Sequence, residues 1–136
     1  MRSIKFLTFT VFPAIIIILV FLNLFVKKKN KNYINYKING KVYKLLIADE
    51  EKEWIKGLMD IKKKQDFDGM IFIFPDKNYR QFWNKNTYLD LDIYWLNDDQ
   101  VVGKDFLPSI EKSKNIVIVN SPKKINKVVE IIKAHP

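Results

Sequence analysis

The strongest constraint on the fold is an alternation of residue types between Leu89 and Trp95. Every second residue is large and apolar, and the residues between are acidic or aromatic: Leu89, Leu91, Ile93 and Trp95 alternate with Asp90, Asp92 and Tyr94. Because successive side chains of a β-strand point to opposite faces, this pattern predicts a strand with one apolar face in the core. The polar segment 84–87 (NKNT) precedes it between aromatic residues. It is expected to form a packed turn that fixes amide and hydroxyl groups in one place.

Turn signals divide the rest of the chain into short β-rich segments. Asn39-Gly40 separates two such segments, and both residues tolerate the positive φ values that a two-residue hairpin requires. A second hairpin is expected around 97–100. About seven or eight strands are predicted in this way, from the segments 33–38, 41–48, 70–74, 79–83, 89–96, 101–106, 116–119 and 128–132.

One short helix is expected between the second and third strands. Asp49 is suited to its N-cap, acidic residues follow in the first turn, and Gly57 is suited to its C-terminal end. Since hairpins predominate and strands do not alternate with helices, the predicted fold class is mainly β. We expect a small barrel-like or strongly curved antiparallel or mixed sheet with one or two short helices, preceded by a single transmembrane helix.

The transmembrane helix is predicted from the N-terminal segment. Residues 6–26 form a run of 21 mostly apolar residues without a charge, which is the length needed to cross a hydrocarbon core of about 30 Å. The run ends without the small-residue cleavage pattern of a secretory signal, so an uncleaved signal anchor is expected. The predicted domains are therefore 1–31, the anchor with a basic linker, and 32–136, a single β-rich domain.

The net charge of +9 belongs mostly to the anchor segment. Residues 1–31 contain six of the 24 basic residues and none of the 15 acidic ones, so residues 32–136 carry a net charge of only +3. Nucleic acid is therefore not an expected partner, whereas the membrane is. Basic residues flank the apolar run on both sides, so the positive-inside rule alone leaves the orientation open.

Several kinds of site are not expected. The chain has no cysteine, and its single histidine, His135, is the penultimate residue. Thiolate, zinc–cysteine and histidine-triad chemistry are thereby excluded or disfavoured. The acidic turn at 97–100 lacks the spacing of a calcium loop. We predict no catalytic residue, no metal site and no cofactor.

Five sequence blocks occur in an order that resembles a known family. They are GLM at 57–59, GMIFIF at 69–74, FWNKNT at 82–87, LDI at 91–93 and VVEI at 128–131. Together they resemble domain of unknown function family 192, also called uncharacterised protein family 0127, over about residues 41–132. The resemblance implies a small β-rich domain on the extracytoplasmic side of the membrane, with no established activity. Asn84 stands where the family usually has Met, and Asp90 where it usually has Pro.

The first functional hypothesis is a non-catalytic binding or accessory module displayed at the cell membrane. Its site would be formed by Trp83, Asn86, Thr87 and Asp92, with Arg80 as an anion contact, and would take an unknown small ligand or an envelope protein. The structural alternative is that the same polar groups satisfy backbone atoms of the turn and strand.

Two other hypotheses stay open. Asp90 and Asp92, about 7 Å apart at successive same-face positions of a strand, suit the carboxylate pair of an inverting cell-envelope hydrolase. An exposed sheet edge would instead suit a protein-interaction module without any pocket, since the family usually continues beyond the last strand seen here.

Overall fold

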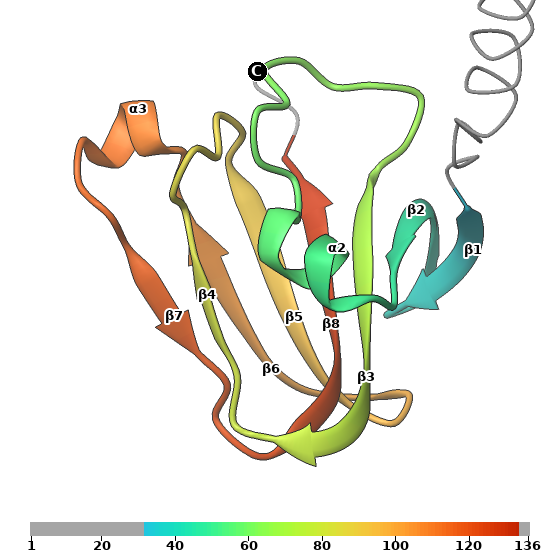
Figure 1. Cartoon of the computed structure of the whole chain (residues 1–136). Helices are drawn as coiled ribbons and strands as arrows, with labels where there is room; N and C mark the ends of the chain where they lie inside the picture. The colour runs from blue at the N-terminus through green and yellow to red at the C-terminus, as the bar shows by residue number, and fades with distance from the viewer. Residues whose placement is uncertain (1–31, 134–136) are drawn as a thin grey trace, which may run out of the picture. The chain divides into compact units, whose positions relative to one another are not determined.

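The computed structural model describes residues 32–133, which contain eight strands and two short helices (Figure 1). In chain order these elements are β1 (Tyr33–Ile38), β2 (Lys41–Ala48), α2 (Glu51–Lys56), β3 (Gly69–Asn78), β4 (Gln81–Trp83), β5 (Leu91–Asn97), β6 (Gln100–Leu107), α3 (Ile110–Ser113), β7 (Ile118–Asn120) and β8 (Ile125–Ile132). The mainly β class predicted from the sequence is thereby confirmed.

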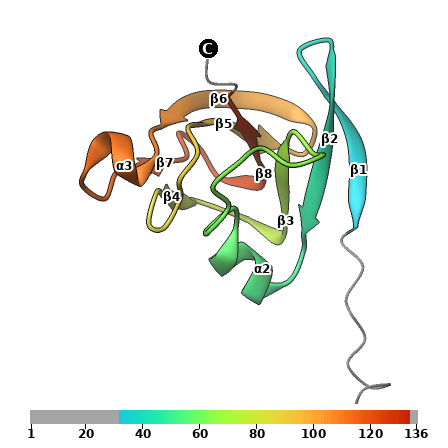
Figure 2. The ribbon, with the colours of Figure 1, turned by 90° about the horizontal axis from the view of Figure 1, so that it is seen from above.

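Six of the strands form one mixed sheet in the order β1-β2-β3-β8-β5-β6, and β4 pairs with β7 in a separate two-stranded sheet. In Figure 2 the strands from β6 to β1 follow a curved line, and α2 and β4 lie on its inner side. The sheet does not close, since β1 and β6 remain at its two edges. A strongly curved open sheet is therefore observed, not a barrel.

The expectation that strands do not alternate with helices is wrong at one place. Strands β2 and β3 run parallel, with Leu45 opposite Gly69 and Ala48 opposite Phe72. Parallel neighbours cannot be joined by a tight turn, so the chain crosses over through α2 and the segment that follows it. This crossover places α2 in front of β3 and β8 in Figure 1.

The alternation in β5 is confirmed, and the sheet is buried on both faces. Leu89, Leu91, Ile93 and Trp95 all belong to the larger core, on the side of α2 and β4. The intervening positions contribute to a second, smaller core on the other face, where Tyr94 and Leu96 pack with residues of β1, β2 and β8. The parity of a residue within β5, and within β8 from Val128 onward, therefore decides which core it joins.

Several local predictions are confirmed, and others differ. Asn39 and Gly40 have φ values of 47° and 85°, as a two-residue hairpin turn requires. Strand β3 continues through Pro75 beyond the predicted run, which is tolerated because its register against β8 shifts between Ile73 and Asn78. The predicted buried strand at 116–119 is instead the exposed β7, which pairs only with β4 among the residues described.

The helices also differ slightly from expectation. The N-cap of α2 is Glu50, one residue after the predicted Asp49, and it forms a reciprocal capping box with Glu53. The predicted loop 107–115 contains α3, whose N-cap Ser109 accepts a hydrogen bond from the backbone N–H of Lys112. A single turn of helix has no periodicity to detect in a sequence.

The predicted transmembrane segment 6–26 lies outside the residues that the structure describes. Within 32–133, neither helix has the length and apolar character that spanning a bilayer requires. The predicted anchor and the division of the chain at residue 31 stay predictions.

Candidate functional site

A cavity of about 700 Å³ opens on the concave side of the curved sheet. Its walls come from α2 and the turn after it, from β3, from the segment 79–83, and from single residues of the loop before β5, the end of β7 and β8. Six aromatic residues line it: Trp54, Phe72, Phe74, Tyr79, Phe82 and Trp83. Its volume lies in the range of about 300–1,000 Å³ that small-molecule sites occupy.

The aromatic walls are fixed by packing and by one hydrogen bond. Trp54 donates from Nε1 to the carbonyl of Ala48 at 3.0 Å, and its ring centroid lies 5.1 Å from that of Phe74. Phe82 packs edge-on against Phe72, with ring centroids 4.8 Å apart. These contacts attach α2 and β4 to β3. The aromatic side chains that line the cavity are therefore held in place by packing against one another.

Glu130 on β8 contributes a buried carboxyl group to this cavity. It is only 4% exposed, and it faces the concave side because it alternates with Val129 and Ile131, which belong to the other core. Its Oε2 atom is buried and has no hydrogen-bond partner among residues 32–133. Burial raises the pKa of this carboxyl from 4.5 to about 8, so the neutral acid predominates at pH 7.

The backbone of Gly57, directly after α2, lies against this carboxyl group. A Cβ atom placed on Gly57 would lie 3.3 Å from the ring of Phe72 and 3.8 Å from Oε2 of Glu130. Gly57 has φ 48° and ψ −135°, a region that side chains strongly disfavour. A glycine here therefore lets the helix end approach the carboxyl group and leaves space beside it.

Glu130 was not among the residues predicted from the sequence, although the sequence contains a signal for it. It is the only charged residue in the apolar run 128–132 (VVEII). An acid within a strand that is otherwise apolar on both faces must be buried, and buried acids are paired or functional.

Three of the five predicted ligand-binding residues line the cavity. Trp83 lies at its mouth with 46% of its surface exposed, and Thr87 is buried. Arg80 also contributes, but its guanidinium stacks 4.1 Å from the centroid of Phe74 and donates from Nη2 to Asp76 at 2.6 Å. Its positive charge is therefore already paired by a carboxylate of the same chain.

The other two predicted residues lie apart from the cavity. Asn86 is exposed in a turn with φ 53°, and its carbonyl accepts a hydrogen bond from the backbone N–H of Asp60. Asp92 alternates with the core residues Leu91 and Ile93 along β5, so its side chain points to the opposite face of the sheet. There it pairs with Lys104 at 2.9 Å and with Lys133 at 3.6 Å. The structure therefore brings Arg80, Trp83 and Thr87 together and does not bring Asn86 or Asp92 to them.

Comparison with known proteins gives a family. The family model DUF192, described as uncharacterized ACR, COG1430, matches residues 34–133. The chain belongs to this family. The resemblance seen in the five sequence blocks is thereby confirmed. No curated protein matches the chain.

Two solved structures resemble this DUF192 domain. One, a proposed transcription regulator from Sinorhizobium meliloti 1021, is 24% identical with a TM-score of 0.57, over 72% of this chain and 76% of that one. The other, a protein of unknown function from Novosphingobium aromaticivorans DSM 12444, is 20% identical with a TM-score of 0.56, over 76% of this chain and 83% of that one. At these identities the likeness shows a shared fold.

The residue at which this DUF192 chain departs from the usual Met, Asn84, has a structural role. Asn84 is fully buried and makes three hydrogen bonds, to the carbonyl of Pro108, the hydroxyl of Ser113 and the backbone N–H of Val117. It joins the turn before β5 to the segments on either side of α3. The packed polar turn predicted from the sequence therefore exists, and its first residue, Asn84, satisfies backbone groups.

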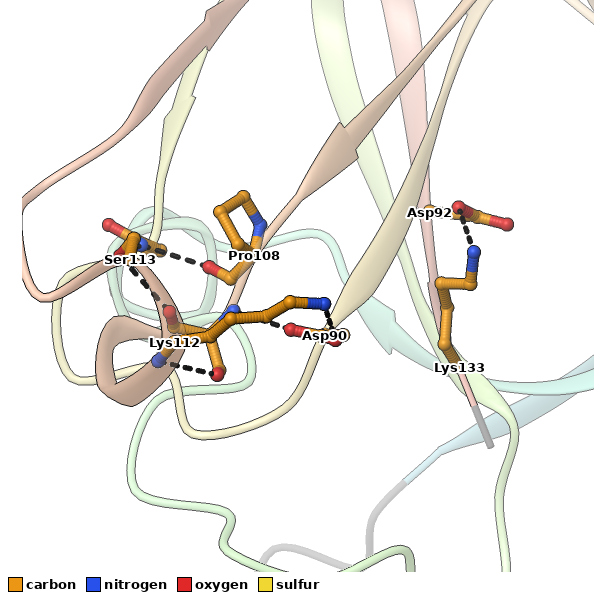
Figure 3. Close-up of polar contacts among 8 residues, drawn as sticks. Asp90, Asp92, Pro108, Lys112, Ser113 and Lys133 are labelled. Carbon is orange, nitrogen blue, oxygen red and sulfur yellow. Dashed lines mark hydrogen bonds and ion pairs between the residues drawn. The ribbon is translucent and has the colours of Figure 1, made fainter. Parts of the chain in front are cut away.

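The second departure, Asp90, belongs to the same corner. One carboxylate oxygen accepts from the backbone N–H of Ser109 at 2.8 Å, and the other pairs with Lys112 at 3.0 Å. Figure 3 shows Lys112 at Asp90 and Lys133 at Asp92, so each carboxylate of the predicted catalytic pair has its own lysine. Neither of them lines the cavity.

No metal centre is evident among the residues described. Within residues 32–133, no group of three or more histidine, cysteine or acidic side chains is arranged to hold a metal ion. The cavity offers one buried carboxyl group, aromatic walls, a guanidinium paired with Asp76, and two exposed charged residues of α2, Glu51 and Lys56.

Proposed function

We propose that this chain is a membrane-anchored, non-catalytic binding module whose DUF192 domain displays its cavity on the extracytoplasmic side of the cell membrane. The observation that carries this proposal is the cavity of about 700 Å³ with a buried carboxyl oxygen that lacks a partner among the residues described. Aromatic walls with a few placed polar groups are typical of small-molecule sites.

Binding without catalysis agrees best with the polar groups in the cavity. Glu130 is the only buried acid there, and the other lining acid, Glu51, is exposed on α2. Hydrolysis by a carboxylate pair needs two acids at the same substrate, one to protonate and one to activate water or attack. Asp90 and Asp92, the candidate pair, are occupied by lysines outside the cavity.

The membrane attachment is tested separately from the binding. Full-length protein is expected in the membrane fraction and to resist extraction by carbonate, whereas a chain starting at residue 32 is expected to be released. A reporter that is active only in the cytoplasm, fused after Pro136, is expected to be inactive. Activity of that reporter would overturn the proposed orientation.

Binding is tested with a panel of small aromatic compounds against the full-length protein in mild detergent, followed by chemical-shift changes or thermal shifts. The Trp83→Ala variant should weaken the binding of any hit at least about fivefold, because it removes an exposed aromatic wall at the mouth, with little change in melting temperature. The matched control is Phe106→Ala on β6, since Phe106 is 42% exposed against 46% for Trp83 and does not line the cavity.

Two outcomes would contradict the proposal. One is that no member of the panel binds at millimolar concentration. The other is that Trp83→Ala and Phe106→Ala weaken a hit equally, since the hit would then bind elsewhere on the surface.

A further inference from the structure

We propose that the ligand of this cavity is a small primary amine on an apolar body, with its ammonium group at Glu130 and its body between the aromatic walls. This inference rests on the proposed binding function and names the ligand class for the same site. It starts from Oε2 of Glu130, which is one of three side-chain atoms that residues 32–133 bury without a hydrogen-bond partner; the others are Nε of Arg80 and Oδ1 of Asn97.

The first step is the need for a hydrogen-bond donor. Oε2 of Glu130 is buried and no donor in 32–133 reaches it. A buried acceptor without a partner destabilises the folded state, and native structures contain few of them. The ionised carboxylate only accepts hydrogen bonds, so a donor on the ligand would give Oε2 its missing partner when Glu130 is ionised.

The second step is the charge of that donor. Phe72 and Glu130 lie so close together that one point, a Cβ position on Gly57, is 3.3 Å from the ring of Phe72 and 3.8 Å from Oε2. An ammonium group hydrogen-bonded to Oε2 would form an ion pair with the ionised carboxylate. A hydroxyl group forms the hydrogen bond without the ion pair.

The third step is the placement of the positive charges that could hold an anionic ligand. Lys56 lines the cavity from α2, but it is exposed to solvent, which screens its charge. Arg80 lines the cavity, but its guanidinium is paired with Asp76 at 2.6 Å and stacked on Phe74. An anion would have to compete with Asp76 and would also approach the buried acid. The local charges therefore favour a cation at the base of the cavity.

The fourth step is the size and surface of the rest of the site. An ammonium group fills only a small part of about 700 Å³. Trp54 and Phe74 form an inner wall, and Ile55, Tyr79 and Trp83 expose apolar surface at the mouth. An arylalkylamine, with a ring system and a short arm to the amine, fits this combination.

The test compares three indoles that share one body: tryptamine, tryptophol and indoleacetic acid. They carry an ammonium, a hydroxyl and a carboxylate group, and their affinities for the full-length protein are measured by titration calorimetry. Tryptamine is expected to bind at least about tenfold more tightly than tryptophol, and indoleacetic acid most weakly. Equal or tighter binding of tryptophol or indoleacetic acid would overturn the amine class and leave the binding function standing.

A pH series on the wild-type protein tests the role of Glu130 without any substitution. Because the pKa of Glu130 is about 8 and that of an alkylamine resembles lysine at about 10.4, tryptamine affinity should rise roughly tenfold from pH 7 to pH 9. Binding at pH 7 should release about one proton, measured in buffers of different ionisation enthalpy. A flat profile without proton release would overturn the proposal.

A variant separates Glu130 from the other charged or titratable groups of the cavity, which are Glu51 and Lys56 on α2 and Tyr79 and Arg80 near its mouth. Glu130→Gln should abolish both the preference for tryptamine and its pH dependence, while tryptophol affinity changes less than about twofold. Asp92→Asn on the opposite face is the matched control and should change neither. If no indole binds at millimolar concentration, the amine class is overturned, and the wider panel then decides the binding function.

Discussion

Two buried acids of this domain have opposite surroundings. Asp90, 6% exposed, accepts from a backbone N–H with one oxygen and pairs with Lys112 through the other. Glu130, 4% exposed, has an oxygen without a partner in the part of the chain that the structure describes, beside an open cavity. A fold that satisfies one buried carboxylate so completely is capable of satisfying the other. This difference is the observation on which the proposed ligand site rests.

The two regions also differ in how their neighbours are held. Asn84 and Asp90 bind backbone groups of the segments around α3, so their contacts stabilise the path of the chain. A Cβ position on Gly57 would lie near both the ring of Phe72 and Oε2 of Glu130, and neither Gly57 nor Phe72 carries a charge. Buried polar networks stabilise a fold when every member is satisfied, whereas an unsatisfied member is a cost. The comparison predicts opposite responses when the two acids are neutralised.

The largest expected effect is the pH dependence of stability that Glu130 creates. Its pKa is 4.5 in the unfolded chain and about 8 in the folded one, so the folded state binds the extra proton between these values. The contribution of the neutral Glu130 carboxyl to the free energy of unfolding is fully present below about pH 4.5 and is lost as the pH rises through about 8. At about 1.4 kcal/mol per pKa unit, wild-type protein should lose roughly 4 kcal/mol of unfolding free energy between pH 5 and pH 9 that Glu130→Gln keeps.

Urea unfolding of both proteins, followed by tryptophan fluorescence at several pH values, gives this difference. The quantity to compare is the slope of stability against pH, since the amide can shift the stability at every pH alike. Parallel curves for the two proteins would mean that Glu130 is ionised or paired in the native state.

The second effect concerns Asn84, which is buried and hydrogen-bonded to the segments on either side of α3. Asn84→Ala removes three hydrogen bonds and leaves buried backbone groups of Pro108 and Val117 without partners. With a cost of about 1–3 kcal/mol for each unsatisfied buried group, unfolding free energy should fall by about 3 kcal/mol. The control is Asn86→Gly, since Asn86 is exposed at φ 53° and glycine tolerates that conformation. Equal destabilisation by the two substitutions would argue against a structural corner centred on Asn84.

Parts of this architecture could be predicted because their signals are local. The alternation at 89–95 and the Asn39-Gly40 turn each lie within a few residues, and the strands and hairpin they predicted are observed. The parallel pairing of β2 with β3 depends on residues that meet only in three dimensions. Short elements such as α3 carry too few residues for any period to be read.

The candidate site could likewise be predicted only where its residues are close in the sequence. Arg80, Trp83 and Thr87 are close in sequence and come together at the cavity. Asp92 does not, because its parity in β5 places it on the face opposite Leu91, whose side chain lies in the cavity-side core. Glu130 reaches the cavity only because β8 inserts between β3 and β5, a strand order that no local pattern encodes.

The third effect is that of neutralising Asp90, which lies with Asn84 in the hydrogen-bonded corner beside α3. Asp90→Asn keeps the shape of the side chain but loses the ion pair with Lys112 and weakens the bond from the N–H of Ser109. A hydrogen bond to a charged group contributes about 1.5–3 kcal/mol, so a loss of about 2 kcal/mol is expected at neutral pH. The loss from Asp90→Asn should be similar at pH 7 and pH 9, whereas Glu130→Gln should gain stability relative to the wild-type protein as the pH rises from 5 to 9. If both variants change with pH in the same way, the contrast between the two acids does not hold.

The smallest expected effect is that of Asp92→Asn. Asp92 pairs with Lys104 and Lys133, whose side chains are both 48% exposed, so water and salt screen the attraction. The unfolding free energy should change by less than about 1 kcal/mol, and by less still at high salt. Ligand affinity should not change, because Asp92 lies on the face of β5 away from the cavity. Denaturation at low and high salt, with calorimetry on the same samples, measures both quantities. A loss of affinity at unchanged stability would restore Asp92 to the binding site and move that site to the other face of the sheet.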